Sequence, residues 1–100
     1  MLTIKKSLQE DHAAVALQGR IDTVTASDLE NELQEIIPAV SELTLDFAEV
    51  DYISSAGLRV LLSSQKLISG KHGQMKLIHV DPMIMGIFEM TGFSDILTIE

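Results

Sequence analysis

Two adjacent serines, Ser54 and Ser55, are the residues of this chain best placed to carry chemistry. They follow a segment with apolar residues at alternate positions, and they precede Leu58, Leu61 and Leu62, whose spacing is helical. This pattern places the serines at the start of a helix, where a hydroxyl meets unpaired backbone N–H groups and the positive end of the helix dipole. Such a position tolerates an anion, so the pair predicts a site suited to a phosphoryl group.

Other kinds of site find little support in the sequence. A serine hydrolase that uses Ser55 would need partners, but there is no Gly-x-Ser-x-Gly motif, and His72 and His79 have no obvious acidic partner. These two histidines and His12 are the three in the chain, and they lack the spacing of metal ligands. The chain has no cysteine. No glycine-rich loop of the Gly-Lys-Ser/Thr kind is present. We therefore expect no catalytic residue, no metal site and no cofactor.

Composition narrows the range of partners. One hundred residues with 46% apolar content predict a single domain over residues 1–100, and only four aromatic residues predict an aliphatic core. Seven basic against fifteen acidic residues give a net charge of −8, which disfavours nucleic acid and anionic membrane surfaces and favours a basic partner. There is no apolar run of membrane-spanning length and no signal-peptide pattern. We expect a complete, soluble, cytoplasmic chain.

The predicted elements alternate between strands and helices. Two short strands form a hairpin, and Gly19–Asp22 breaks the second of them. Thr23 or Thr25 can cap the first helix, which Pro38 ends. The order β-β-α-β-α-β-α-β predicts an α/β fold with a mixed, mostly parallel sheet flanked by helices. The expected strands are 2–8, 13–18, 43–53, 75–80 and 96–99, and the expected helices are 23–37, 54–70 and 81–92.

Helix ends and helix faces can also be predicted. Gly70-Lys-His-Gly73 supplies the expected C-cap glycine of the second helix, and Asp81-Pro82 is a strong start for the third, which lasts until Gly92. The acidic face of the first helix is interpreted as solvated. The methionines of the third helix could form a soft recognition surface, but we favour adaptable packing in the core or near the surface. These methionines are Met83, Met85 and Met90.

With these elements placed, the chain resembles the STAS domain family, and above all its small, free-standing bacterial members, the anti-sigma factor antagonists. The resemblance rests on Gly19-Arg-Ile-Asp22, on Leu45-Asp-Phe47 and on Tyr52-Ile-Ser-Ser-Ala-Gly-Leu58, the most specific of the three. It implies the STAS fold and no enzymatic activity. It also implies reversible phosphorylation of one serine by an anti-sigma factor that is a serine kinase, with removal of the phosphate by a PP2C-type phosphatase.

The resemblance assigns roles to individual residues. The phosphorylated serine falls on Ser55, with Ser54 as the second choice, and Ser54 stands where many members have Asp. Gly19 and Asp22 correspond to a loop beside the phosphorylation site that joins the partner-binding surface. Three residues of the following helix complete the predicted partner-binding set together with the two serines: Gly57, Leu58 and Arg59.

Charge gives this switch a physical basis. A phosphoryl group adds about −1.5 to −2 charges. We expect Asp22, Asp46, Glu49 and Asp51 in or near the flanking loops, so that the added charge would oppose desolvation at an interface. Arg59 could pair with Asp51, contact a partner, or simply be solvated.

Two functions follow from the resemblance. In the first, the unmodified chain binds an anti-sigma factor and so releases a sigma factor, and phosphorylation at Ser55 ends the binding. In the second, the chain is a non-phosphorylated STAS scaffold subunit of a transport or signalling complex. The serine at position 54 keeps the second function open.

Overall fold

The structure is a computed structural model and describes residues 2–100. Its strands and helices follow one another in the predicted order, which confirms the α/β fold. Two short 3₁₀ turns, η1 and η2, are additional. The elements are β1 (Leu2–Gln9), β2 (His12–Ile21), α1 (Thr25–Ile36), η1 (Ile37–Ala39), β3 (Glu42–Ile53), α2 (Ser55–Gly70), β4 (Gln74–Ile78), α3 (Pro82–Thr91), η2 (Phe93–Asp95) and β5 (Thr98–Ile99).

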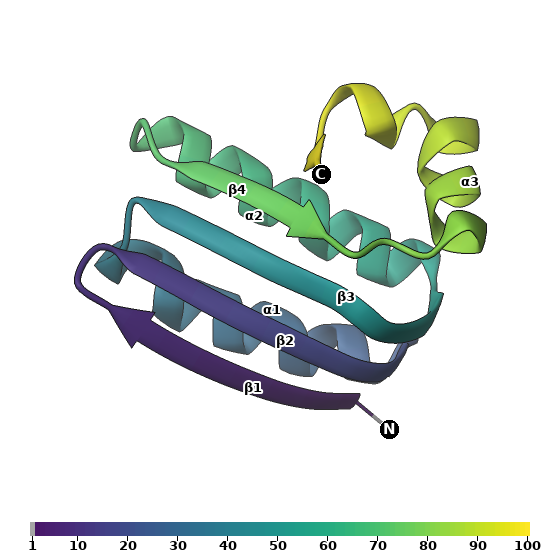
Figure 1. Ribbon diagram of the computed structural model, residues 1–100, viewed down its shortest axis with the longest axis horizontal. Coiled ribbons are helices and arrows are strands. Elements are labelled where there is room, and N and C mark those ends of the chain that lie inside the picture. Colours follow the sequence, from purple (N-terminus) through teal and green to yellow (C-terminus); the bar gives the residue numbers. More distant parts are fainter. Residues whose placement is uncertain (1) are drawn as a thin grey trace.

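The five strands form one sheet in the order β1-β2-β3-β4-β5. β1 pairs with β2 in antiparallel fashion, and every later pairing is parallel, so the sheet is mixed and mostly parallel as predicted. α1 and α2 lie together on one face of this sheet, and α3 lies beyond the end of β4 (Figure 1). The carboxyl ends of β2, β3 and β4 therefore share one edge.

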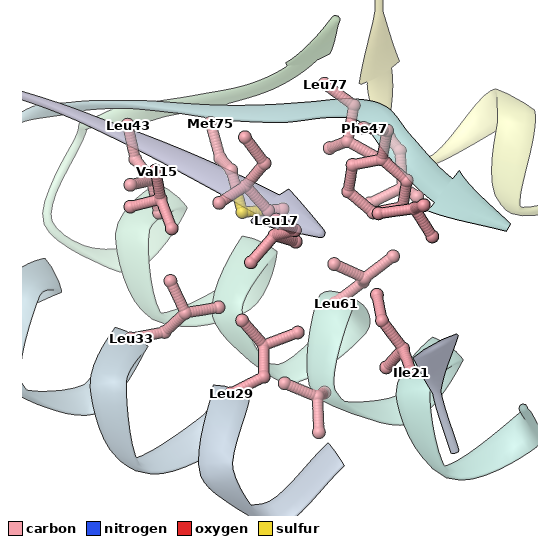
Figure 2. Close-up of a cluster of buried hydrophobic side chains, with 14 of the residues drawn as sticks. Val15, Leu17, Ile21, Leu29, Leu33, Leu43, Phe47, Leu61, Met75 and Leu77 are labelled. Atoms are coloured by element: carbon pink, nitrogen blue, oxygen red, sulfur yellow. The ribbon is translucent and has the colours of Figure 1, made fainter. Parts of the chain in front are cut away.

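The core lies between the sheet and the two helices α1 and α2. Leu43, Leu45 and Phe47 alternate along β3 and are fully buried, because alternate residues of a strand face the same side. Side chains from the helices meet them, among them Leu29 and Leu61 (Figure 2). Each side chain of this size stabilises the fold by about 1.5–3 kcal/mol when it leaves water. The core is aliphatic apart from two phenylalanines.

The unequal lengths of β3 and β4 explain where α3 lies. β4 ends at Ile78, which pairs with Asp46, whereas β3 continues to Ile53. α3 packs beside this unpaired part of β3, and Phe88 meets Phe47 edge to face with 6.4 Å between ring centroids. The third helix thus covers part of the core that β4 is too short to cover.

Three predicted strand boundaries are wrong, and one of them is the end of β4, which comes at Ile78 and not at Val80. β2 does not break at Gly19 but continues to Ile21, because Gly19 adopts a φ of 115° at a shift in register with β3. Only a residue without Cβ takes up that conformation readily, so the glycine lets β2 continue past a bulge in β3, where Asp51 is the extra residue between Val50 and Tyr52. At the other end of the chain, β5 is limited to Thr98–Ile99, because η2 occupies the preceding residues.

The turn after α2 also differs from the prediction. Gly70 is still helical, and the left-handed residue that ends the turn is His72, with a φ of 65°. Gly73 is required for a different reason: a Cβ atom there would lie 2.6 Å from the carbonyl oxygen of Ser41. Gly73 therefore does not form a left-handed turn. It allows the loop before β4 to approach the loop before β3 closely.

The predictions for α3 were right at its ends and partly wrong on its surface. The Asp81 carboxylate accepts a hydrogen bond from the amide of Met83 at 2.7 Å, and the helix ends at Gly92 with a φ of 81°. Met85 packs against the core, but Met83 and Met90 are 75% and 89% exposed. Core packing is therefore wrong for Met83 and Met90, which lie at the surface.

Lys71 fastens α2 to the segment that follows α1. Its ammonium group donates to the carbonyl oxygen of Ile37 at 2.7 Å and to that of Val40 at 2.8 Å. Carbonyl groups at the end of a helix lack intrahelical donors, so this side chain satisfies two of them from another element. These two hydrogen bonds join the C-terminal end of α2 to the segment that follows α1.

Lys71→Met should reveal the strength of this contact. The substitution keeps the aliphatic chain but removes the charged donor, and we expect the free energy of unfolding to fall by about 1–2 kcal/mol. Urea denaturation provides the measurement. Lys66→Met, at an exposed position of the same helix, is the control and should change stability by less than about 0.5 kcal/mol. Equal losses in the two variants would contradict the role given to Lys71.

Candidate functional site

The site lies where β2 and β3 end and α2 begins. Ile21 and Ile53 are paired as the last residues of their strands. The amide of Ser54 then donates to the carbonyl oxygen of Ile21 at 2.8 Å. This hydrogen bond brings the loop between β2 and α1 beside the first turn of α2, at the right-hand end of the sheet in Figure 1.

The two serines have different positions in the first turn of α2. Ser54 has extended backbone angles and is the N-cap, and its Oγ accepts a hydrogen bond from the amide of Gly57 at 3.2 Å. Its carbonyl oxygen accepts from the amide of Leu58 at 3.0 Å. Ser55 is the first helical residue, and its side chain is exposed. Ser54 therefore serves the helix, whereas the hydroxyl of Ser55 faces solvent.

Gly57 and Leu58 place this turn against the sheet. A Cβ atom at Gly57 would lie 2.7 Å from Cγ2 of Ile21 and 2.8 Å from Cγ1 of Ile53, closer than real Cβ contacts occur. Only glycine allows the first turn of α2 to sit directly on the ends of both strands. Leu58 is buried in the core and anchors the same turn.

Asp22 caps α1, which corrects the prediction that Thr23 or Thr25 would do so. Its Oδ1 accepts hydrogen bonds from the amides of Val24 at 3.0 Å and Thr25 at 2.9 Å. The Thr25 hydroxyl instead accepts from the amide of Asp22 and donates to the carbonyl oxygen of Arg20. The hydrogen bond from the Thr25 amide lowers the pKa of Asp22, because it favours the ionised carboxylate.

Around the serines lie exposed side chains that sequence reasoning did not assign to the site. Arg20 lies over the ring of Tyr52, with 4.4 Å between its Cζ and the ring centroid, and Val24 is 76% exposed. The stacked pair forms because Arg20 and Tyr52 face each other across β2 and β3. That register depends on two bulges, so no local pattern in the sequence could have revealed it.

Arg59 lines a groove of about 290 Å³ between α1 and α2. It is exposed, and among residues 2–100 it has no carboxylate oxygen within 4.0 Å. The ion pair with Asp51 that the sequence allowed does not form. The groove starts beside the first turn of α2 and is lined by Thr23, Ala26, Ser27, Glu30, Ala56, Arg59, Val60 and Ser63.

Of the carboxylates expected in or near the flanking loops, only Asp22 lies in a loop. Asp46, Glu49 and Asp51 are all within β3, because this strand continues through two register shifts to Ile53. Asp46 accepts a hydrogen bond from the amide of Ala48, which lowers its pKa, and His79 adds to the effect. Exposed Asp51 remains near the serines in the chain.

Metal-ligand groups and membrane-spanning helices are absent from the described residues 2–100. Residues 2–100 contain no group of three or more His, Asp or Glu side chains arranged to hold a metal ion. No helix within the same residues has the length and apolar character needed to cross a membrane. The site is thus a surface of exposed polar and apolar side chains around one serine hydroxyl.

A family model described as the MlaB-type STAS domain matches residues 4–98. The chain belongs to the STAS domain family. This confirms the resemblance, since the match spans nearly the whole chain and includes both strand ends and the first turn of α2.

Similar proteins carry the names of regulators. BtrV of Bordetella bronchiseptica, assigned as an anti-sigma factor antagonist, is 36% identical over 84 residues, which are 83% of this chain and 72% of that protein. The anti-sigma-B factor antagonist of Listeria monocytogenes is 31% identical over 98 residues, 95% of this chain and 84% of that protein. Such names denote regulatory binding proteins, not enzymes.

The fold likewise matches a known structure. SpoIIAA, an anti-sigma factor antagonist solved in unphosphorylated and phosphorylated forms, superposes with TM-scores of 0.80 and 0.78 at 15% sequence identity. The matches cover 98% of this chain and 87% and 91% of the respective SpoIIAA chains. At this level of identity the comparison establishes the STAS fold.

Gly57→Ala should disturb the packing of the first turn of α2 against the ends of β2 and β3. We expect the free energy of unfolding to fall by about 1–3 kcal/mol, because the added methyl group must displace Ile21 or Ile53. Gly86→Ala is the matched control: nothing lies within 4 Å of its Cβ, and alanine in a helix interior should stabilise by about 0.5–1 kcal/mol. Chemical denaturation measures both, and equal signs for the two variants would contradict the packing argument.

Asp22→Ala should have a pH-dependent effect. The folded-state pKa of Asp22 is below its unfolded value, so its stabilisation is present above the unfolded pKa and is lost as pH falls through the folded one. We therefore expect a lower thermal midpoint than wild type at pH 7 and a smaller difference at pH values below about 3. Asp28→Ala in the first turn of α1 is the control, and a deficit that stays constant with pH would contradict the ionic cap.

Proposed function

We propose that this chain is an anti-sigma factor antagonist, a cytoplasmic binding protein whose partner is an anti-sigma factor with serine kinase activity. The observation that carries the proposal is the division between the two serines. Ser54 caps α2 through its side chain, whereas Ser55 is exposed at the N-terminus of the same helix. Membership of the STAS family and the regulators among its relatives support the same function.

In the proposed cycle, the unmodified chain binds the anti-sigma factor and a sigma factor is released. The kinase then transfers the γ-phosphoryl group of ATP to Oγ of Ser55: the new O–P bond forms, the bond to the β-phosphate breaks, and ADP and the hydroxyl proton leave. A PP2C-type phosphatase hydrolyses the ester and restores binding. SpoIIAA, which has the same fold, exists in a phosphorylated form.

The partner-binding surface in this proposal combines the loop between β2 and α1 with the first turn of α2. It contains Asp22, Ser55 and Arg59 at the protein surface, with Gly19 and Gly57 setting the backbone beneath them. Val24 and Tyr52 add exposed apolar area, which suits a protein partner.

Phosphorylation would weaken binding without unfolding the chain. The helix end accepts an anion at Ser55, and the residue makes no part of the core. At an interface, however, about two extra negative charges must be desolvated on a chain whose net charge is already −8. A loss of about 3–4 kcal/mol in binding free energy lowers affinity several hundredfold.

The alternative is a constitutive STAS scaffold subunit in a transport or signalling complex. Two observations favour it: serine, not aspartate, caps α2, and the matching family model is described as MlaB-type. Incubation with ATP and the cognate kinase, followed by mass measurement, separates the two functions. A phosphate mapped to Ser55 supports the switch, and no incorporation supports the scaffold.

Ser55→Asp should imitate the modified state in part. We expect at least a hundredfold loss of affinity for the cognate anti-sigma factor in calorimetric titration, because a charge must be buried at the interface. Ser55→Ala should bind like wild type but accept no phosphate. Ser54→Ala is the companion control: it should lose about 1 kcal/mol of stability through the cap and still become phosphorylated. Undiminished binding by Ser55→Asp would contradict the proposed switch.

A further inference from the structure

Arg59 is a cation without an internal partner in an acidic protein. Lys6 and Lys76 form ion pairs with glutamates, and Lys71 is engaged by backbone carbonyl groups. Arg59 has no carboxylate oxygen within 4.0 Å in residues 2–100, although the chain has fifteen acidic residues. Its guanidinium group, which carries five N–H donors, is therefore available.

Helix geometry directs this free cation toward Ser55. The two residues are four positions apart in α2, which places them on the same face about 6 Å apart along the axis. Side chains of a helix lean toward its N-terminus, so Arg59 extends over the turn that begins with Ser55. Arg59 also lines the α1–α2 groove together with Ala56, the residue that follows Ser55.

The other groups near Ser55 leave room for an anion. Ser54 uses its Oγ and its carbonyl oxygen to accept the amides of Gly57 and Leu58. The amides of Ser55 and Ala56 precede the first intrahelical hydrogen bond and have no acceptor within the helix. An anion attached to Ser55 would meet these two donors on one side and the guanidinium group of Arg59 on the other.

We propose that Arg59 is the internal counter-ion of a phosphoryl group on Ser55, an inference that rests on the proposed modification of that residue. Among the nearby charged groups, Glu30 lines the groove together with Arg59, Asp22 lies on the β2–α1 loop, and Asp51 and the stacked Arg20 lie near the ends of β3 and β2. Asp22 is engaged by two amides, and Glu30 carries one charge against the two of a phosphate.

This arrangement gives phosphorylation a second consequence besides added charge. Once Arg59 binds the phosphoryl oxygens, it is no longer free to contact a partner from the wall of the α1–α2 groove. The guanidinium group offsets part of the phosphate charge locally, and it is withdrawn from the surface that a partner would contact. Arg59 thus acts as a positioning residue that holds the modified side chain over its own helix.

The test uses the full chain with phosphoserine installed at position 55 during translation, so that no kinase is needed. The ³¹P chemical shift is followed against pH to give the second pKa of the phosphate, which is about 6 in the absence of interactions. Arg59→Gln should raise this pKa by about 0.4 unit relative to wild type, because a neighbouring cation favours the dianion. Arg59→Lys should retain part of the difference.

Lys66→Gln is the matched control, with the same change of charge on the same helix but eleven residues from Ser55. It should leave the phosphate pKa unchanged. Equal pKa values in wild type and Arg59→Gln, or equal shifts in Arg59→Gln and Lys66→Gln, would overturn the proposal. Failure of the proposed function would give a different result. The phosphorylated wild type would still bind the anti-sigma factor with undiminished affinity, and the phosphate pKa would still differ between wild type and Arg59→Gln.

Discussion

The structure depends on one close contact, the seating of the first turn of α2 on the ends of β2 and β3. Gly57 makes it possible, because any side chain there would collide with Ile21 and Ile53. The hydrogen bond from Ser54 to Ile21 then ties the two segments together. Without this contact the capping loop of α1 and the serines of α2 would not share a surface. A packing constraint in the core thus creates the site at its edge.

At this site, helix capping and the exposed hydroxyl group belong to different residues. Asp22 and Ser54 satisfy backbone amides at the starts of α1 and α2, so the helices do not depend on Ser55. The hydroxyl of Ser55 is consequently free to change its charge at little cost to the fold. The proposed modification there would act on what the surface binds, since the residue contributes to neither the caps nor the buried cluster.

Features that depend on neighbouring residues could be predicted from the sequence. The errors concern features that depend on how distant strands pair. Asp81-Pro82 and Gly92 mark the ends of α3 through groups within a few residues, so they could be predicted from the sequence. The end of β2 was misplaced because Gly19 lies opposite a bulge in β3 that arises only when the two strands pair, and the Arg20–Tyr52 stack depends on the same register. The exposure of Met83 and Met90 depends on where α3 packs, which the length of β4 decides.

The length of β3 connects these features. Because it outruns β4, it provides a seat for α3 on one side and carries Tyr52 and Asp51 beyond the core to the edge where α2 begins. The two register shifts with β2 bring Ile21 and Ile53 level, so that both strands end together beneath Gly57. A β3 ending with β4 would leave α2 without this seat. The exposed serine is therefore a consequence of strand length and bulges in the sheet, as much as of the motif that contains it.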